Sequence, residues 1–272
     1  MSTNWQPALS DLLRYLDGIG YGDVYLKPPR PAVRQAEPEP VQIPATGPAG
    51  PVSVADDLVE AAVPPVAAAP PVLEPVAPVS MEAADTAGQV EQLAALGQSV
   101  EGCTRCRLAE GRHKVVFGSG NPQADLMFIG EGPGAEEDRQ GLPFVGAAGE
   151  LLTRMIQAID MTRQEVYIAN VVKCRPPGNR DPQPDEISAC RGYLERQIAL
   201  VRPKLIVALG KIAAQALLGN DSPVGRMRGQ WHQFGAIPLM VTYHPAALLH
   251  NPALKRPTWE DLQQVRDRLR GA

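Results

Sequence analysis

A proline-rich stretch sets the first limit on what this chain can fold into. Residues 28–88 hold fourteen of the 28 prolines, interleaved with Ala and Val, and contain no aromatic residue. Each proline removes a backbone donor and clashes with the preceding helical turn, and the segment lacks the large side chains that offset the entropy of ordering it. We therefore predict a flexible linker over residues 21–88 and one folded domain over residues 89–272.

Residues 1–20, which precede the linker, have apolar side chains at helical spacing at Trp5, Leu9, Leu12, Leu13 and Leu16. So short a helix is not stable alone. It is either a frayed helix or a peptide that docks on a partner protein. With the linker it forms a disordered N-terminal extension.

Charge divides along the same boundary, because residues 1–90 carry a net charge of −7 and residues 91–272 carry +3. A mildly basic domain permits a nucleic-acid partner without requiring one. No apolar stretch approaches the roughly 20 residues that span a bilayer, and the N-terminus lacks the pattern of a signal peptide. We therefore predict a cytoplasmic protein with no membrane contact, in a reducing compartment that disfavours disulfides.

Beyond the linker, apolar runs alternate with amphipathic segments. This pattern predicts strands at 126–129, 166–172, 205–209 and 239–243, and helices at 149–159, 184–201, 211–218 and 258–270. The last helix is predicted to begin at a Thr258 cap, with Asp261 three residues on. The alternation implies a three-layer α/β/α fold with a central, mostly parallel four-stranded sheet. Sites in such sheets lie at the carboxyl ends of the strands, where the polar residues of this chain also gather.

All four cysteines lie in the folded domain. Two residues separate Cys103 from Cys106, and this spacing lets both thiolates reach one ion or cluster from a tight turn. Cys174 and Cys190 can join them only through the tertiary fold. The alternative is four buried free thiols, and spacing alone leaves both zinc and a [4Fe–4S] cluster open. Because no Cys is left over for redox turnover, we predict a structural metal centre.

A loop rich in glycine and acidic residues, residues 130–138, follows the first predicted strand. It matches neither GxGxxG nor a Lys-bearing phosphate loop, and its four acids would repel a nucleotide phosphate. Its glycines instead offer exposed backbone amides and close approach to a flat ligand.

Four segments in colinear order, 130–138, 141–149, 170–177 and 243–245, resemble the family 4 uracil-DNA glycosylases, the iron–sulfur members of the uracil-DNA glycosylase superfamily. The resemblance runs from about Leu96 to Arg270 and does not cover residues 1–88. It implies a monomeric enzyme that excises uracil from double- or single-stranded DNA and leaves an abasic site, the first step in base excision repair of deaminated cytosine. It also implies a structural [4Fe–4S] cluster on Cys103, Cys106, Cys174 and Cys190.

The resemblance assigns uracil binding to several positions. Phe144 would stack on the base, although a core aromatic is equally consistent with its residue type. Asn170 would accept from uracil N3–H and donate to O4, which rejects cytosine; an Asx turn or a cap is the alternative. Backbone amides at Gly130, Glu131 and Gly132 would bind the remaining oxygen.

The chemical step would depend on His244, whose N–H, aimed at O2, would stabilise the departing uracil anion. Superfamily members with an Asp directly after the first strand use it to position water, but this chain has Gly132 there. Glu137 is therefore our first candidate for that role and Glu131 the second. Glu137 could instead lie beside uracil C5 and exclude the methyl group of thymine.

Contacts with DNA are expected from a loop and from basic residues. The segment 244–252 resembles the family's insertion loop, with Leu248 as the wedge that holds the base step open; a buried core Leu is the alternative. Candidate phosphate contacts are Lys173, Arg175, Arg180, Lys255 and Arg256. Two rival functions remain, namely a non-catalytic nucleic-acid-binding module with a structural metal and a superfamily relative with altered base preference.

Overall fold

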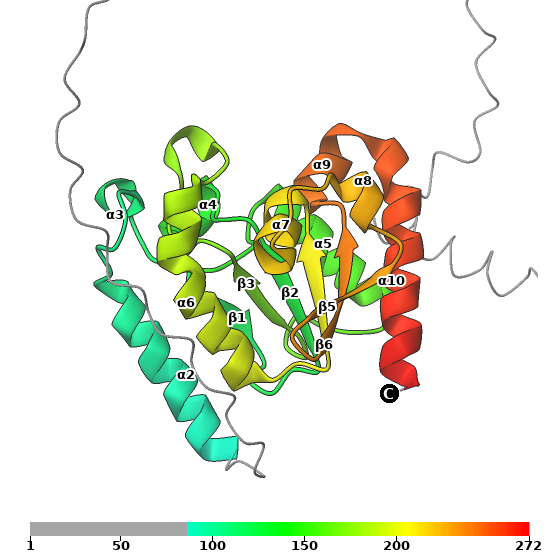
Figure 1. The fold of residues 1–272 in the computed structure, drawn as a ribbon, viewed down its shortest axis with the longest axis horizontal. Helices are drawn as coiled ribbons and strands as arrows, with labels where there is room; N and C mark the ends of the chain where they lie inside the picture. The colour runs from blue at the N-terminus through cyan, green and yellow to red at the C-terminus, as the bar shows by residue number, and fades with distance from the viewer. Residues whose placement is uncertain (1–85, 272) are drawn as a thin grey trace, which may run out of the picture. The chain divides into compact units, whose positions relative to one another are not determined.

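The structure, a computed structural model, describes residues 86–271 (Figure 1). The expectations for residues 1–20 and for most of the linker lie outside the described residues. The strands are β1 (Ser119–Gly120), β2 (Leu126–Gly130), β3 (Tyr167–Asn170), β4 (Leu205–Leu209), β5 (Trp231–Phe234) and β6 (Ile237–Thr242). They form one sheet in the order β1-β3-β2-β4-β6-β5.

The four predicted strands are the inner four of this sheet, and all pair in parallel. Strands β1 and β5 pair antiparallel at the two edges and were not predicted. Their sequences explain this, because β1 is two residues long and β5 is the mostly polar, half-exposed segment Trp-His-Gln-Phe. Neither contains an apolar run from which a strand can be predicted.

Helices cover both faces of the sheet. The longer ones are α2 (Thr86–Glu101), α5 (Ala147–Ala158), α6 (Pro184–Val201), α7 (Lys211–Leu218) and α10 (Lys255–Arg270). The short ones are α3 (Leu108–Gly111), α4 (Ala135–Gln140), α8 (Val224–Met227) and α9 (Pro245–His250), with 3-10 turns at Pro177–Asn179 and Pro252–Leu254. The bounds predicted for α6 and α7 are confirmed, and helix α2 was not predicted.

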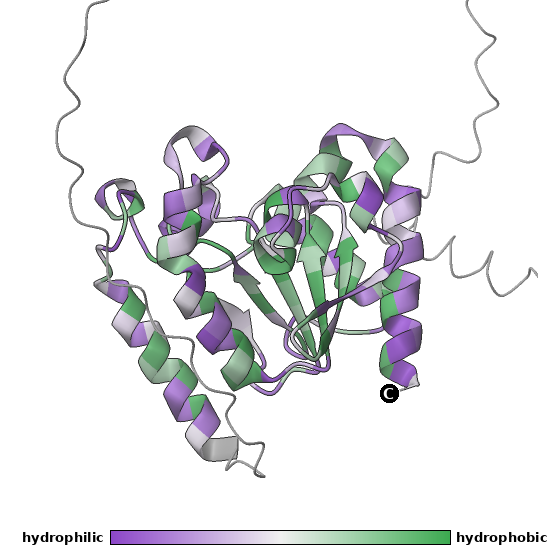
Figure 2. Cartoon of the chain, in the orientation of Figure 1, coloured by the Kyte–Doolittle hydropathy of each residue, from purple (hydrophilic) through white to green (hydrophobic). Residues whose placement is uncertain are grey.

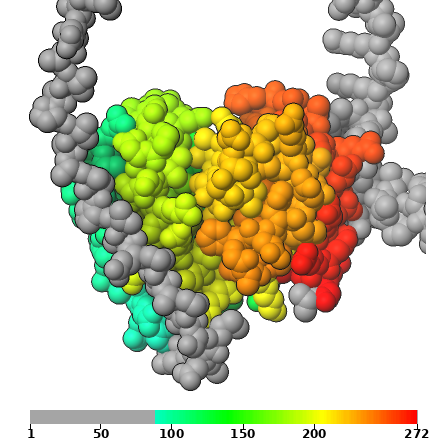
Figure 3. Space-filling model, viewed as in Figure 1, coloured from blue at the N-terminus to red at the C-terminus, as the bar shows by residue number. Residues whose placement is uncertain are grey.

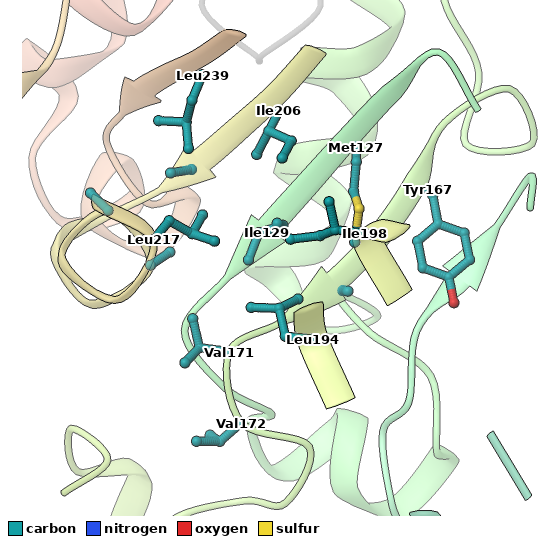
Figure 4. Packing of buried hydrophobic residues seen from close by; sticks show 14 of the residues in the cluster. Met127, Ile129, Tyr167, Val171, Val172, Leu194, Ile198, Ile206, Leu217 and Leu239 are labelled. Atoms are coloured by element: carbon teal, nitrogen blue, oxygen red, sulfur yellow. The ribbon is translucent and has the colours of Figure 1, made fainter. Parts of the chain in front are cut away.

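Side-chain alternation along the strands builds a core on each face. In β2, Met127 and Ile129 pack toward α6 and α7, whereas Leu126 and Phe128 pack toward α5 and α10. Figure 4 shows the first core, with residues of β2, β4 and β6 meeting Leu194 and Ile198 of α6 and Leu217 of α7. Hydropathy follows these layers, because the strands are apolar while the helices carry hydrophilic residues (Figure 2). The predicted three-layer α/β/α architecture is confirmed.

The predicted start of the last helix is wrong. Helix α10 begins at Lys255, and Thr258 lies inside it, donating its hydroxyl to the Leu254 carbonyl at 2.8 Å. Asp261 does not take part in a capping box. Its carboxylate accepts from Arg228 and from the Thr242 hydroxyl at the end of β6.

Three helices gather at one end of the sheet. Helices α4, α7 and α9 follow β2, β4 and β6 and lie at the carboxyl ends of these strands (Figure 1). In the space-filling view, α6 and α7 lie side by side over the sheet on the face toward the viewer (Figure 3). Within residues 86–271, none of the helices combines the length and apolar character needed to cross a membrane.

Candidate active site

A pocket of about 420 Å³ opens at the carboxyl ends of the parallel strands. Its walls come from the loops after β2, β3 and β6 and from the start of α5. They include most of the residues predicted to act on the base: Glu131, Gly132, Glu137, Phe144, Asn170 and His244. Residues far apart in sequence therefore meet as the strand-end rule predicts.

Asn170 forms the floor of the pocket. It is the last residue of β3, opposite Gly130 in β2, and its side chain is 1% exposed. Its side-chain oxygen is buried and has no hydrogen-bond partner in the protein. A buried polar atom without a partner is costly unless a ligand supplies one. Asn170 thus lines the pocket and carries an unused hydrogen-bond acceptor.

Gly130 does not line the pocket, but its lack of a side chain leaves room for the side chains of Asn170 and Phe144 to approach it. A Cβ at this position would lie 2.5 Å from both the Asn170 side-chain oxygen and the Phe144 ring. Any side chain there would push these groups apart. Gly130 thus contributes close approach, the second role that its sequence position suggested.

Phe144 stands beside Asn170, with its side chain mostly buried against the core of α5 and α9. Its ring centroid lies 5.5 Å from that of His244, with 35° between the ring planes. Phe144 therefore packs on the core and also lines the pocket, while its stacking on a base stays a prediction.

His244 follows β6 and caps the N-terminus of α9. Its Nδ1 accepts from the backbone N–H of Ala246 at 3.2 Å, so in the neutral ring the proton resides on Nε2. Enclosure in the pocket lowers the pKa of His244 to about 4, although the negative charge of Glu137 acts in the opposite direction. At neutral pH the residue is therefore an uncharged donor.

The two candidate carboxylates differ in their surroundings. One oxygen of Glu137 accepts from the backbone N–H groups of Val145 and Gly146, at 3.0 and 3.1 Å. Glu131 makes no such contact, and burial, reinforced by the charge of Asp181, raises its pKa to about 7. Glu137 therefore helps to hold the Phe144 loop, whereas Glu131 is protonated in a large fraction of molecules at neutral pH.

The four cysteines line one small cavity, together with Arg112 and Lys173. Arg112 donates to the Cys103 carbonyl at 2.6 Å and to the Cys174 sulfur at 3.4 Å. Burial raises the pKa of the Cys190 thiol to about 11, and the positive charge of Lys173 counteracts this rise. Among residues 86–271, no three His, Cys, Asp or Glu side chains stand close enough to hold a single ion.

Two predicted DNA contacts are wrong in this structure. Lys173 is fully buried, and its ammonium donates to the Asn170 carbonyl at 2.7 Å and to the Gln197 side chain. Leu248 is also fully buried, in the core beneath α9. Neither can touch DNA without rearrangement. Leu249, the next residue, is 43% exposed.

The other four basic candidates reach the surface. Arg180 lines the pocket and pairs with the buried Glu186 at 2.7 and 2.8 Å. Arg175 donates to Asn179, and Arg256 is 78% exposed beside Glu260. Lys255 is partly exposed at the start of α10. Sequence reasoning missed Glu186, whose only local signal is its place in the first turn of α6.

Comparison of the sequence with known proteins identifies the family of this chain. Residues 117–263 match the family model described as the uracil DNA glycosylase superfamily. The type-4 uracil-DNA glycosylase of Sulfurisphaera tokodaii is 44% identical over 187 residues, which are 65% of this chain and 85% of that relative. That of Thermotoga maritima is 41% identical, over 65% of this chain and 94% of the relative. A type-5 uracil-DNA glycosylase of Thermus thermophilus is 34% identical, over 48% and 68%.

Proposed function

The chain belongs to the type-4 uracil-DNA glycosylases of the uracil DNA glycosylase superfamily, and on this premise we propose that it hydrolyses the N-glycosidic bond of uracil in DNA. The product is an abasic site, so the reaction begins the repair of deaminated cytosine. The observation that carries this proposal is the buried, unpartnered side-chain oxygen of Asn170 at the floor of the pocket.

Base recognition follows from that oxygen. It can accept from N3–H of uracil while the amide nitrogen of the same side chain donates to O4. Cytosine presents a lone pair at N3 and an amino group at C4, so both contacts would become repulsive. A site that leaves its own polar groups unpaired with the wrong base rejects that base strongly. Phe144 lies beside Asn170, where an aromatic ring can stack on the base.

Bond cleavage leaves negative charge on the base and positive charge on the sugar. His244, with its proton on Nε2, is our proposed donor to uracil O2 as the charge develops there; its tautomer and neutral state support this role. Glu137 is near enough to His244 to affect its pKa, and one of its carboxylate oxygens stays outside the backbone contacts. We assign that oxygen to the attacking water, with Glu131 as the second candidate.

The uracil base must leave the duplex before it can enter the pocket. Leu249 replaces Leu248 as the proposed wedge, because it is exposed on α9, five residues beyond His244. Arg175, Lys255 and Arg256 remain proposed phosphate contacts. Phosphate contacts of this kind position the DNA and supply affinity without reading sequence.

The cysteine cavity fits a [4Fe–4S] cluster. Four thiols from three parts of the chain surround one hollow, and two cations, Arg112 and Lys173, stand beside it to balance thiolate charge. Four thiols can hold either a cluster or a single zinc ion, and the likeness to type-4 uracil-DNA glycosylases favours the cluster. When bound, the cluster supplies a cross-link among the Cys103 loop, the end of β3 and α6.

The test is excision from an oligonucleotide that contains one uracil, followed by alkali to reveal abasic sites. Asn170→Asp should excise uracil far more slowly and begin to excise cytosine weakly, because the carboxylate cannot donate to O4 but can accept from the cytosine amino group. A wild-type protein that binds DNA without cleaving at uracil would favour the non-catalytic module. Faster excision of another deaminated base would favour the relative with altered preference.

Three properties stay proposals beyond this chemistry. They are a monomeric state, a cytoplasmic location and a protein partner for residues 1–20. Light scattering of the purified protein tests the first, and binding of a peptide spanning residues 1–20 to other replication and repair proteins tests the last.

A further inference from the structure

The backbone of Phe144 is held in an unfavourable conformation. Its φ angle is +53°, in the left-handed region that a bulky aromatic residue rarely adopts. Such conformations persist only where the surroundings impose them, and they concentrate at functional sites. The structure shows which side chain imposes this one.

Arg163, from the segment between α5 and β3, donates hydrogen bonds to two backbone carbonyls of the loop that carries Phe144. One guanidinium nitrogen donates to the Pro143 carbonyl at 2.8 Å, and the other donates to the Phe144 carbonyl at 3.1 Å. The second nitrogen also lies 3.3 Å from the Thr153 hydroxyl of α5. A planar guanidinium fixes two acceptors at a set angle, which a lysine ammonium cannot do.

The opposite side of the loop is held as well. Glu137 accepts from the N–H groups of the next two residues, Val145 and Gly146. Gly149 lets the loop lie directly on α5, since a Cβ there would be 1.9 Å from the Phe144 carbonyl oxygen. Arg163 and Glu137 thus clamp consecutive peptide groups from two directions, and the Phe144 ring is left with one orientation.

Arg163 does not line the active-site pocket. It lines a separate hollow on the other side of Phe144, with Gln140, Leu142 and Glu150. Any effect on the base must therefore pass through the loop that carries the aromatic ring.

We propose that Arg163 is a positioning residue that sets the orientation of the Phe144 ring and so the stacking of the excised base. This inference rests on the proposed function. A misplacement of about 1 Å in a residue that orients a substrate can cost on the order of 100-fold in rate. DNA affinity should hardly change, because phosphate contacts supply most of it.

The experiment measures single-turnover uracil excision, inhibition by free uracil, DNA binding and thermal unfolding for three variants. Arg163→Lys keeps the charge but loses the fork, and we expect excision to slow about 10-fold to 100-fold with DNA affinity within about twofold. Free uracil should inhibit this variant more weakly. Thr153→Val, which removes one anchor of the fork, should act in the same direction but less. Arg270→Lys is the control, because Arg270 pairs with Asp160 at the surface.

A double-mutant cycle separates positioning from general destabilisation. If Arg163 acts through the ring, Arg163→Lys should cost little further rate once Phe144→Leu has removed the platform. The proposal is overturned if Arg163→Lys loses the same factor in rate with and without Phe144→Leu. It is also overturned if Arg163→Lys and Thr153→Val both keep the excision rate and the uracil inhibition of the wild type. Absence of excision by the wild type would instead overturn the proposed function.

Discussion

His244 should accelerate bond cleavage as a neutral hydrogen-bond donor. The N–H of Ala246 occupies Nδ1, so Nε2 carries the proton that we propose is donated to the leaving base. The enclosed ring has a pKa of about 4, compared with 6.5 for a free histidine, so the site disfavours the charged ring by roughly 3 kcal/mol relative to water. On our proposal, the protein therefore stabilises the uracil anion with a dipole and not with an imidazolium.

The size of the effect can be estimated from similar donors. Removing one preorganised donor to a developing oxyanion costs about 2.7–4 kcal/mol, which corresponds to a 100-fold to 1000-fold loss of rate. His244→Ala should show this loss in single-turnover excision of uracil. Base choice should stay intact, because O2 is common to uracil and cytosine. His232→Ala, on the edge strand β5 and outside the lining of the pocket, serves as the control.

The assay is single-turnover excision from uracil-containing duplexes between pH 5.5 and 8.5, with DNA binding measured separately. The deficit of His244→Ala should be constant across this range, because the residue stays neutral throughout. Near-normal rates in His244→Ala would refute its role as a donor. A wild-type rate that changes with an apparent pKa near 6.5, and loses that change in His244→Ala, would refute the neutral ring.

Three further outcomes are expected. Protein purified in air should be yellow-brown with about four irons per chain, and Cys103→Ser should lose iron and thermal stability, whereas a colourless protein with one zinc would contradict the cluster. Leu249→Ala should slow excision from duplex DNA more than from single strands, because only a duplex base must be held out of the stack. The control is Val90→Ala, which changes an exposed apolar residue on α2. Equal effects of Leu249→Ala on both substrates would exclude the wedge. The raised pKa of Glu131 means that the folded protein binds the Glu131 proton more tightly than the unfolded chain does between pH 4.5 and about 7, so the stability of the wild type falls as the pH rises through this window. The melting temperature of Glu131→Gln should therefore rise relative to that of the wild type from pH 5 to 8. Parallel pH profiles of the two proteins would contradict this.

The central sheet could be predicted because each inner strand is a continuous buried apolar run. Strand β4, for example, is Leu-Ile-Val-Ala-Leu with every residue buried. The edge strands could not be predicted, because β1 is only two residues long and β5, although it pairs with the next strand β6 across a two-residue turn, has no continuous buried apolar run. Thr258 was wrongly predicted as a helix cap for a different reason. A threonine that donates to a carbonyl four residues earlier inside a helix has the same sequence appearance as a cap.

The residues of the pocket could be predicted as a group, but the direction of single side chains could not. The strand-end rule brings Asn170 and His244 together whatever the details of packing. Leu248 and Leu249 are equivalent as residue types, and the rotation of about 100° per residue on α9 decides which one faces solvent. Lys173 was assigned to the surface by its charge, yet the Asn170 carbonyl and Gln197 satisfy its ammonium inside the protein.

Three features of the pocket are unfavourable for the protein without substrate. The Asn170 oxygen is buried without a partner, which typically costs about 1–3 kcal/mol, and Phe144 holds a strained backbone angle of similar cost. Glu131 is half neutralised by burial. Two of these features have a support on the adjacent backbone, namely Lys173 on the Asn170 carbonyl and Arg163 on the Phe144 carbonyl, while the charge of Lys211 partly offsets the rise in the pKa of Glu131. The two supports contact backbone carbonyls, so they hold the chain in place and leave the Asn170 side-chain oxygen unsatisfied. Bound uracil can supply what is missing, and a site preorganised in this way spends little free energy on rearrangement when the base enters.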